Sequence, residues 1–167
     1  TNVSLADGTL TNIAVQGEYI SSVGEKFDKG LEVIDCKGLI ALSGFVDLHT
    51  HLREPGFEQS ETILTGSKAA AMGGFTCVHP MANTNPVADN SAVVEQVHAL
   101  GVAASFVQVQ PIGAVTAKLE GKNLADLGKM NASAAKVNVF SDDGKCVSDS
   151  LVMRRALEYV KAFDGVI

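Results

Sequence analysis

The sequence predicts an α/β fold, the first half of a (β/α)8 TIM-type barrel preceded by a small β layer. Strand-like and helix-like segments alternate from Gly44 to the end of the sequence, and this alternation is typical of a parallel sheet. Polar, turn-prone residues follow the strand-like segments at intervals of about 30 residues, one βα unit of such a barrel. They lie at 49–53, 81–85, 111–114 and 141–144. Eight such units make a barrel of about 250 residues, so four are expected here.

Residues 1–42 have a different pattern. Short apolar or β-branched segments at 12–16, 19–23 and 32–34 are separated by turn signals at 17–18, 24 and 29–30. No helix signal precedes Gln59. We therefore assign residues 1–42 to a small β domain and residues 43–167 to the first four βα units of a truncated barrel.

The elements expected from Gly44 onward alternate without exception. Gly73-Gly74 predicts the end of the first helix, Asn90 or Ser91 the start of the second, and Gly101 its end. A doubly wound open sheet is the competing fold, but no Gly-rich phosphate loop follows the first strand. The expected order is strand 44–51, helix 58–72, strand 75–81, helix 91–100, strand 103–110, helix 124–130, strand 136–140, helix 148–163 and a further strand beginning at 166–167.

Composition and charge exclude several classes of protein. The chain has 167 residues, 46% of them hydrophobic, and a net charge of −6. An acidic chain is a poor partner for nucleic acid or for an anionic membrane surface. No apolar run approaches the roughly 20 residues of a membrane span. Cys36, Cys77 and Cys146 are widely spaced, which excludes a Cys-based zinc site and fits a reducing cytoplasm.

The chemistry is concentrated in residues 44–56, GFVDLHTHLREPG. Residues two apart on a strand share a face, so Asp47, His49, His51 and Arg53 are expected on one side. Two imidazoles side by side at a strand end can bind one metal ion. The alternative is two unrelated histidines on a solvent-exposed strand edge.

Four motifs together resemble the dihydroorotases of the amidohydrolase superfamily. They are the segment 44–58, ETILTGSKAAAMGGFT at 61–76, MANTNPVAD at 81–89 and FSDDG at 140–144. The resemblance is to the bacterial class in which an Asp is the bridging metal ligand, and it runs from about Val33 to the end. It implies that residues 1–42 are the N-terminal part of a small β-sandwich.

The resemblance also implies roles for individual residues. His49 and His51 would be metal ligands, and Asp143 would bridge two zinc ions, with Asp142 as the alternative. Arg53 and Asn83 would bind the carboxylate and ring of the substrate. Further histidine ligands and the general acid/base Asp of the family would lie beyond Ile167, so no catalytic residue is expected within this chain.

Other polar residues receive less prominent roles. Ala82 stands where the family usually has Pro, a change that removes no ligand. We interpret His79 as a packed, hydrogen-bonded histidine rather than a third metal ligand, and His98 as a surface residue. Lys136 lies at the wrong end of its predicted strand to be the carboxylated lysine of related enzymes.

The implied function is a zinc-dependent cyclic-amide hydrolase, with one or two Zn²⁺ ions, that interconverts N-carbamoyl-aspartate and dihydroorotate in pyrimidine biosynthesis. A hydantoinase or allantoinase of the same superfamily, or an inactive scaffold homologue, remains an alternative. The chain resembles only the N-terminal part of such an enzyme, so it is expected to be inactive alone. A cytoplasmic homo-oligomer is expected, with aspartate transcarbamoylase as a candidate partner and no nucleic acid or membrane partner.

Overall fold

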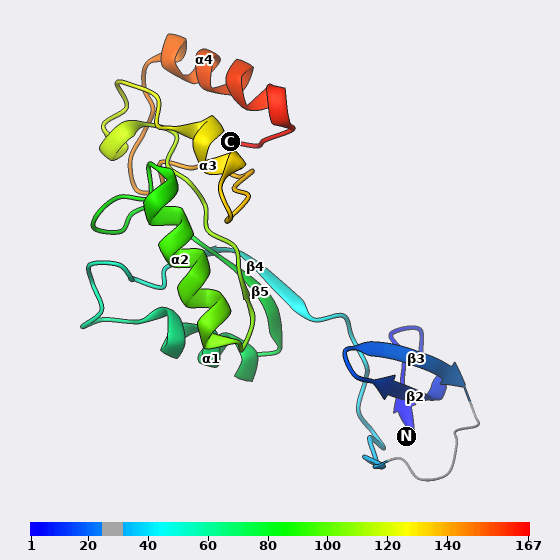
Figure 1. Ribbon diagram of the computed structural model, residues 1–167. Helices are drawn as coiled ribbons and strands as arrows, with labels where there is room; N and C mark the ends of the chain where they lie inside the picture. The colour runs from blue at the N-terminus through cyan, green and yellow to red at the C-terminus, as the bar shows by residue number, and fades with distance from the viewer. Residues whose placement is uncertain (25–31) are drawn as a thin grey trace. The chain divides into compact units, whose positions relative to one another are not determined.

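A computed structural model describes residues 1–24 and 32–167 (Figure 1). These residues form a mixed α/β structure with two small sheets. The chain divides into two compact units, Thr1–Ser43 and Gly44–Ile167. The turn predicted at 29–30 lies outside the described residues. Among the described helices, none has both the length and the apolar character that crossing a membrane requires.

The first unit is an antiparallel sheet of three strands, in the order β1-β2-β3. The strands are β1 (Val3–Ser4), β2 (Leu10–Gln16) and β3 (Tyr19–Gly24). Gly17, at φ +60°, lies in the tight turn between β2 and β3, a conformation that costs glycine little. The two strands predicted on either side of this turn are confirmed.

The prediction of a strand at 32–34 is wrong. These residues belong to no strand. Ile34 instead uses its carbonyl oxygen to accept a hydrogen bond of 2.6 Å from the N-terminal ammonium group of Thr1. Sequence patterning missed strand β1 with its antiparallel pairing to β2, and it missed a parallel bridge between Ser4 and Ile40.

The second unit is built on a parallel sheet with the strand order β4-β5-β6. The strands are β4 (Phe45–Thr50), β5 (Phe75–Pro80) and β6 (Gln108–Val109). β4 and β5 agree with the prediction to within a residue or two. The predicted strand 103–110 shrinks to two residues, because the preceding helix takes the first part of it.

Single parallel bridges extend this order beyond β6. Gly113 bridges Phe140, and Val139 bridges Val166. The backbone N–H of Ser141 donates to the carbonyl of Gly113 at 2.9 Å, and that of Phe140 donates to Val166 at 2.9 Å. The segments near 113, 140 and 166 therefore neighbour one another in chain order. The strand predicted at 136–140 is reduced to its last two residues.

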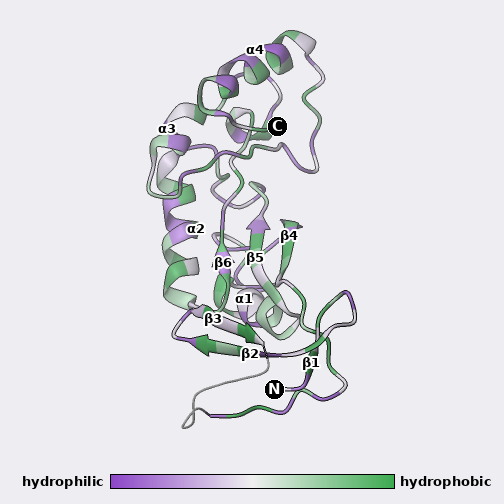
Figure 2. Cartoon of the chain, turned by 90° about the vertical axis from the view of Figure 1, so that its right-hand side faces the viewer, coloured by the Kyte–Doolittle hydropathy of each residue, from purple (hydrophilic) through white to green (hydrophobic). Residues whose placement is uncertain are grey.

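Helices α1 (Ile63–Met72) and α2 (Ser91–Ala104) pack against each other and against β5 and β6, respectively. Figure 2 shows both helices beside the three strands. The core between them contains Leu52, Ile63, Val78, Val97 and Val109. A larger apolar cluster includes Leu127, Met130, Val137 and Phe140.

Helix α1 begins five residues later than predicted, at Ile63 instead of Glu58. Thr62 is its N-cap: the Thr65 backbone N–H donates to the Thr62 hydroxyl at 3.1 Å, and the Thr62 N–H donates to the Thr65 hydroxyl at 3.1 Å. This reciprocal pair satisfies backbone donors that would otherwise have no partner. The helix ends at Gly73, as predicted.

Helix α2 begins at Ser91, and the Asn90 side chain accepts from the backbone N–H of Val93 at 3.3 Å. The predicted end at Gly101 is wrong, because the helix continues to Ala104 and ends at Ser105, which has φ +57°. Gly101 is needed for close packing instead. A Cβ atom at Gly101 would lie 2.4 Å from Cβ of Val109.

The helix predicted at 124–130 is observed later in the chain, as α3 (Leu127–Ala132), and the one predicted at 148–163 is shortened to α4 (Ser150–Val160), followed by a 3₁₀ turn, Lys161–Phe163. A further 3₁₀ turn, Ala117–Leu119, was not predicted. The Asp149 side chain caps α4 by accepting from the N–H groups of Leu151 and Val152 at 2.8 and 3.2 Å. This cap moves the start of the helix two residues beyond the predicted one.

Candidate metal centre

Three side chains from two distant parts of the second unit converge at the ends of its strands. His49 lies near the carboxyl end of β4, His51 follows that strand, and Asp143 lies in the turn after the bridged residue Phe140. One ligand atom from each of the three lies within 4.8 Å of the others. In parallel α/β folds, sites form at this end of the sheet.

The Asp143 carboxylate faces both imidazoles. Its Oδ1 lies 3.3 Å from Nε2 of His49, and its Oδ2 lies 3.5 Å from Nε2 of His51. The side chain of His49 is 54% exposed, whereas that of Asp143 is 20% exposed. The site is therefore open on the His49 side and enclosed around the carboxylate.

The donor atoms and their spacing fit a divalent metal such as zinc. Imidazole nitrogen and carboxylate oxygen are common zinc ligands, and tetrahedral bonds of about 2.0–2.2 Å put neighbouring ligand atoms about 3.3–3.6 Å apart. The two distances from Asp143 to the histidines, 3.3 and 3.5 Å, lie in this range. The three side chains could hold one ion, and the second carboxylate oxygen could reach another.

Asn83 connects two of these three residues. Its Oδ1 lies 3.1 Å from Nδ1 of His51, and its Nδ2 donates to Oδ2 of Asp143 at 2.9 Å. The loop that carries Asn83 is held against the His51 loop by the backbone. The Met81 N–H donates to Thr50 at 2.9 Å, and the Asn85 N–H donates to Pro55 at 3.0 Å.

Asp142 has a different environment from its neighbour. It is 6% exposed, and its Oδ1 accepts from the backbone N–H groups of Val115 and Thr116 at 2.8 and 3.0 Å. Its Oδ2 accepts from the Thr116 hydroxyl. Asp142 thus anchors the turn to the segment at 115–116, while Asp143 points to the histidines.

Arg53 follows His51 by two residues and lies beyond the end of β4. The strand ends at Thr50, and Arg53 itself has φ +62°, so the alternation of faces along β4 does not extend to it. Its side chain is exposed and makes no hydrogen bond or ion pair within residues 1–24 and 32–167. We predicted that Arg53 shares a strand face with His49 and His51, but this prediction assumed a longer strand. Because β4 ends at Thr50, it does not place the side chain of Arg53.

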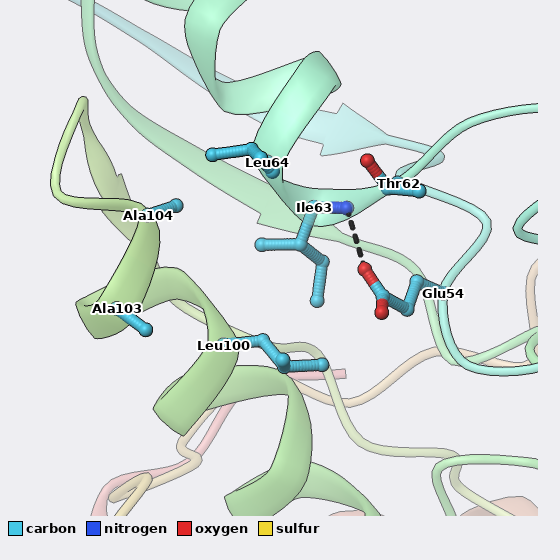
Figure 3. A pocket seen from close by; sticks show the side chains of 7 residues that line it. All are labelled: Glu54, Thr62, Ile63, Leu64, Leu100, Ala103 and Ala104. Atoms are coloured by element: carbon cyan, nitrogen blue, oxygen red, sulfur yellow. Dashed lines mark hydrogen bonds between the residues drawn. The ribbon is translucent and has the colours of Figure 1, made fainter.

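The two acidic residues near Arg53 are occupied by backbone donors. Glu54 accepts from the N–H of Ile63 at 2.8 Å (Figure 3), which caps the start of α1. Glu58 accepts from the N–H of Gly56 at 2.8 Å, and this hydrogen bond lowers the pKa of Glu58. Neither carboxylate forms an ion pair with Arg53 in the described structure, so the guanidinium remains available for a ligand.

The other candidate residues lie outside the cluster. His79 on β5 is half-buried, with Nε2 3.6 Å from the Cys77 sulfur, and burial lowers its pKa while the charge of Asp47 opposes the shift. His98 is half-buried rather than at the surface, because it lies on α2 beside the buried Val97. Lys136 is exposed, with φ +51°.

Sequence reasoning missed two contacts that organise the site. Glu54 caps a helix that begins nine residues later, and Asn83 contacts both His51 and Asp143, which lie 32 and 60 residues from it in the sequence. No local pattern signals either contact, because each depends on how the strand-end loops meet. The acidic residue before Pro55 and the MANT motif identified the loops that carry these contacts. They did not predict the hydrogen bonds themselves.

The fold and the cluster together define an α/β protein with a histidine–carboxylate site at the carboxyl ends of parallel strands. A family profile described as Dihydro-orotase-like matches residues 38–167. The chain belongs to this dihydroorotase-like family, whose characterised members are hydrolytic enzymes.

Curated relatives agree with this assignment. The chain is 63% identical over 168 residues to a dihydroorotase of Leifsonia xyli subsp. xyli, an alignment that covers 100% of this chain and 38% of the relative. It is 58% identical to a dihydroorotase of Streptomyces coelicolor and 52% identical to one of Mycobacterium tuberculosis. Each of those alignments covers 96% of this chain and 38% of the relative. The chain therefore spans about 38% of the length of these relatives.

Proposed function

We propose that the complete protein is a zinc-dependent dihydroorotase that interconverts N-carbamoyl-aspartate and dihydroorotate. The observation that carries this proposal is the convergence of His49, His51 and Asp143 within 4.8 Å, in a chain 63% identical to a dihydroorotase over its whole length. A zinc ion in such a site supplies Lewis acidity, which polarises a carbonyl and favours ionisation of water near neutral pH.

The chain's own residues would hold the metal and orient the substrate. His49 and His51 would each offer one ring nitrogen, and Asp143 would offer two oxygens, which suits a bridging position between two ions. Arg53 would grip the substrate's carboxylate, since a planar guanidinium can form two parallel hydrogen bonds with it. Asn83 would add a further donor on the ring side.

The architecture proposed for the complete protein is a (β/α)8 barrel with a small β-sandwich. Supporting observations are the parallel order β4-β5-β6, its extension through Gly113, Phe140 and Val166, and the separate antiparallel sheet at residues 1–24. The remaining histidine ligands and the general acid/base Asp would then come from the part of the protein outside these residues. Residues 1–42 and 43–167 would belong to the sandwich and the barrel, respectively.

The test is a substrate panel on the complete purified protein with its zinc content measured. Dihydroorotate and N-carbamoyl-aspartate should be turned over, whereas hydantoin and allantoin should be poor substrates. Preference for either of the latter would assign the protein to a sibling hydrolase. A protein that binds zinc but turns over none of the four would fit a scaffold, and copurification with aspartate transcarbamoylase would then identify its partner. The native mass measured at the same time tests whether the protein is a homo-oligomer.

A further inference from the structure

The side-chain amide of Asn83 is hydrogen bonded on both of its polar atoms to candidate metal ligands. Oδ1 lies 3.1 Å from Nδ1 of His51, and Nδ2 lies 2.9 Å from Oδ2 of Asp143. Asn83 is half-buried between them. An amide held on both sides is a rigid spacer, so it constrains the groups that it joins.

The chemistry of the partners determines the orientation of the amide. A carboxylate has only acceptor atoms, so the group facing Asp143 must be the NH₂ donor. The other end, which faces His51, is then the carbonyl oxygen, an acceptor. The orientation thus follows from the hydrogen-bond partners and not from the shape of the side chain, in which O and N are nearly alike.

This orientation selects one tautomer of His51. Because Asn83 Oδ1 can only accept, Nδ1 of His51 must carry the proton. In a neutral imidazole, Nε2 then has a free lone pair, the form that binds a metal. This Nε2 atom lies 3.5 Å from Oδ2 of Asp143, so two acceptor atoms face each other where a cation would bind both.

We propose that Asn83 is a positioning residue that holds His51 in its Nδ1–H tautomer and fixes Asp143, so that both present acceptor atoms to one cation. The inference rests on the proposed metal centre and adds a role to the substrate contact suggested above. The two roles are compatible, because an amide NH₂ has two N–H donors and Asp143 uses one. The second N–H remains for the substrate's carboxylate.

Outer hydrogen-bonding partners of this kind commonly affect a metal site. Groups that hold a histidine ligand by its other ring nitrogen fix its tautomer and ring orientation, and their loss typically costs about 10–100-fold in metal affinity. We therefore expect Asn83→Ala to weaken Zn²⁺ binding by about 10–100-fold in the complete protein. Asn85→Ala is the matched control, since Asn85 lies on the same loop, is exposed, and makes no side-chain hydrogen bond within the described residues.

The decisive readout is the tautomer of His51 in metal-free protein. With ¹⁵N-labelled histidine at about pH 9, where imidazole is neutral, NMR distinguishes a protonated from an unprotonated ring nitrogen. Signals of His51 are assigned by their loss in His51→Gln. The wild type and Asn85→Ala should show Nδ1–H alone. Asn83→Ala should show a mixture of the Nδ1–H and Nε2–H forms.

The two measurements separate this inference from the proposed function. If the wild type binds zinc and Asn83→Ala keeps both its zinc affinity and the Nδ1–H tautomer, the positioning role is overturned while the metal centre stands. If the wild type binds no zinc, the proposed function fails, and the tautomer experiment still decides whether Asn83 controls His51. Nε2–H in the wild type would overturn the inference in either case.

Discussion

Asp142 and Asp143 are neighbours in the chain, but their carboxylates bind groups in different parts of the structure. Asp142 accepts two backbone N–H groups at 2.8 and 3.0 Å from Val115 and Thr116. Asp143 lies 3.3 and 3.5 Å from the Nε2 atoms of His49 and His51. The buried carboxylate therefore fixes the turn, and the fixed turn presents the second carboxylate to the histidines.

This division predicts opposite results for two conservative substitutions in the complete protein. Asp143→Asn should lose bound zinc and most activity, because an amide lacks the charge and offers a single good acceptor. Asp142→Asn should keep most of its zinc. It should instead lower the free energy of unfolding by about 1–3 kcal/mol, the cost of leaving buried polar groups poorly paired. Elemental analysis measures the metal, and denaturant unfolding measures the stability.

Each variant serves as the control for the other, since both exchange one carboxylate for an amide at adjacent positions. Loss of zinc in Asp142→Asn with retention in Asp143→Asn would reverse the assignment. The bridging ligand would then be Asp142.

The sequence predicted the elements that depend on local signals and misplaced those that depend on distant contacts. β4, β5 and the start of α2 follow from strand patterning and the Asn90 cap. Gly101 reads locally as a helix end, but the structure needs it inside α2 because Val109 of β6 approaches its Cα. The later strands are short because single bridges near Gly113 and Phe140 replace longer pairing.

The site was predictable to a similar degree. The motifs that contain His49, His51 and Asp143 identified candidate ligands, and the family resemblance favoured Asp143, but the residue pattern alone did not separate Asp143 from Asp142. Where a strand ends, the alternation of side chains between its two faces no longer determines which of two neighbouring side chains faces the site. The hydrogen bonds of Val115 and Thr116 to Asp142 distinguish the two in the structure, and these partners are 26 and 27 residues away in sequence.

The packing of Gly101 predicts a stability effect far from the site. In Gly101→Ala, the new methyl group would lie 2.4 Å from Cβ of Val109, so the helix or the strand must move. Overpacking of this kind costs about 1–3 kcal/mol, although alanine favours a helix by roughly 1 kcal/mol. We expect a net loss in the free energy of unfolding. Val102→Ala, at an exposed position on the same helix, is the control and should change stability little.

The 167 residues alone should not catalyse ring closure of N-carbamoyl-aspartate. They supply three proposed metal ligands, and in the described residues β4 has a strand partner, β5, on one side. Val46 and Leu48 of that strand are 53% and 68% exposed. An open, apolar strand edge favours association. The purified chain should therefore be inactive with zinc and self-associate in light scattering, and turnover at the rate of the complete protein would contradict the prediction.

His79 should make the fold sensitive to acid. Burial lowers its pKa, against the opposing effect of Asp47, so the unfolded chain binds a proton more readily than the folded one. Stability contributed by neutral His79 is then present above the ordinary pKa of about 6.5 and is lost as pH falls below it. In His79→Gln, the drop in melting temperature between about pH 7.5 and pH 5.5 should be smaller than in the wild type. An equal drop would mean that other groups account for the acid sensitivity.

The last prediction concerns the contribution of Arg53 to substrate selectivity. Its guanidinium has no carboxylate partner within the described residues, and the nearby Glu54 and Glu58 accept from backbone N–H groups. A hydrogen bond to a charged group contributes roughly 1.5–3 kcal/mol, so losing a two-bond grip on the substrate should cost about 10²–10⁴ in kcat/KM. In the complete protein, Arg53→Ala should keep its zinc and lose most turnover of dihydroorotate. It should lose far less on a cyclic amide without a carboxylate.

Arg53→Lys should recover only part of the lost activity, since an ammonium is a point charge and not a planar fork. Arg155→Ala, on the exposed face of α4, controls for loss of a positive charge. Equal losses on both substrates would mean that Arg53 supports the metal site or the fold and does not bind the substrate's carboxylate.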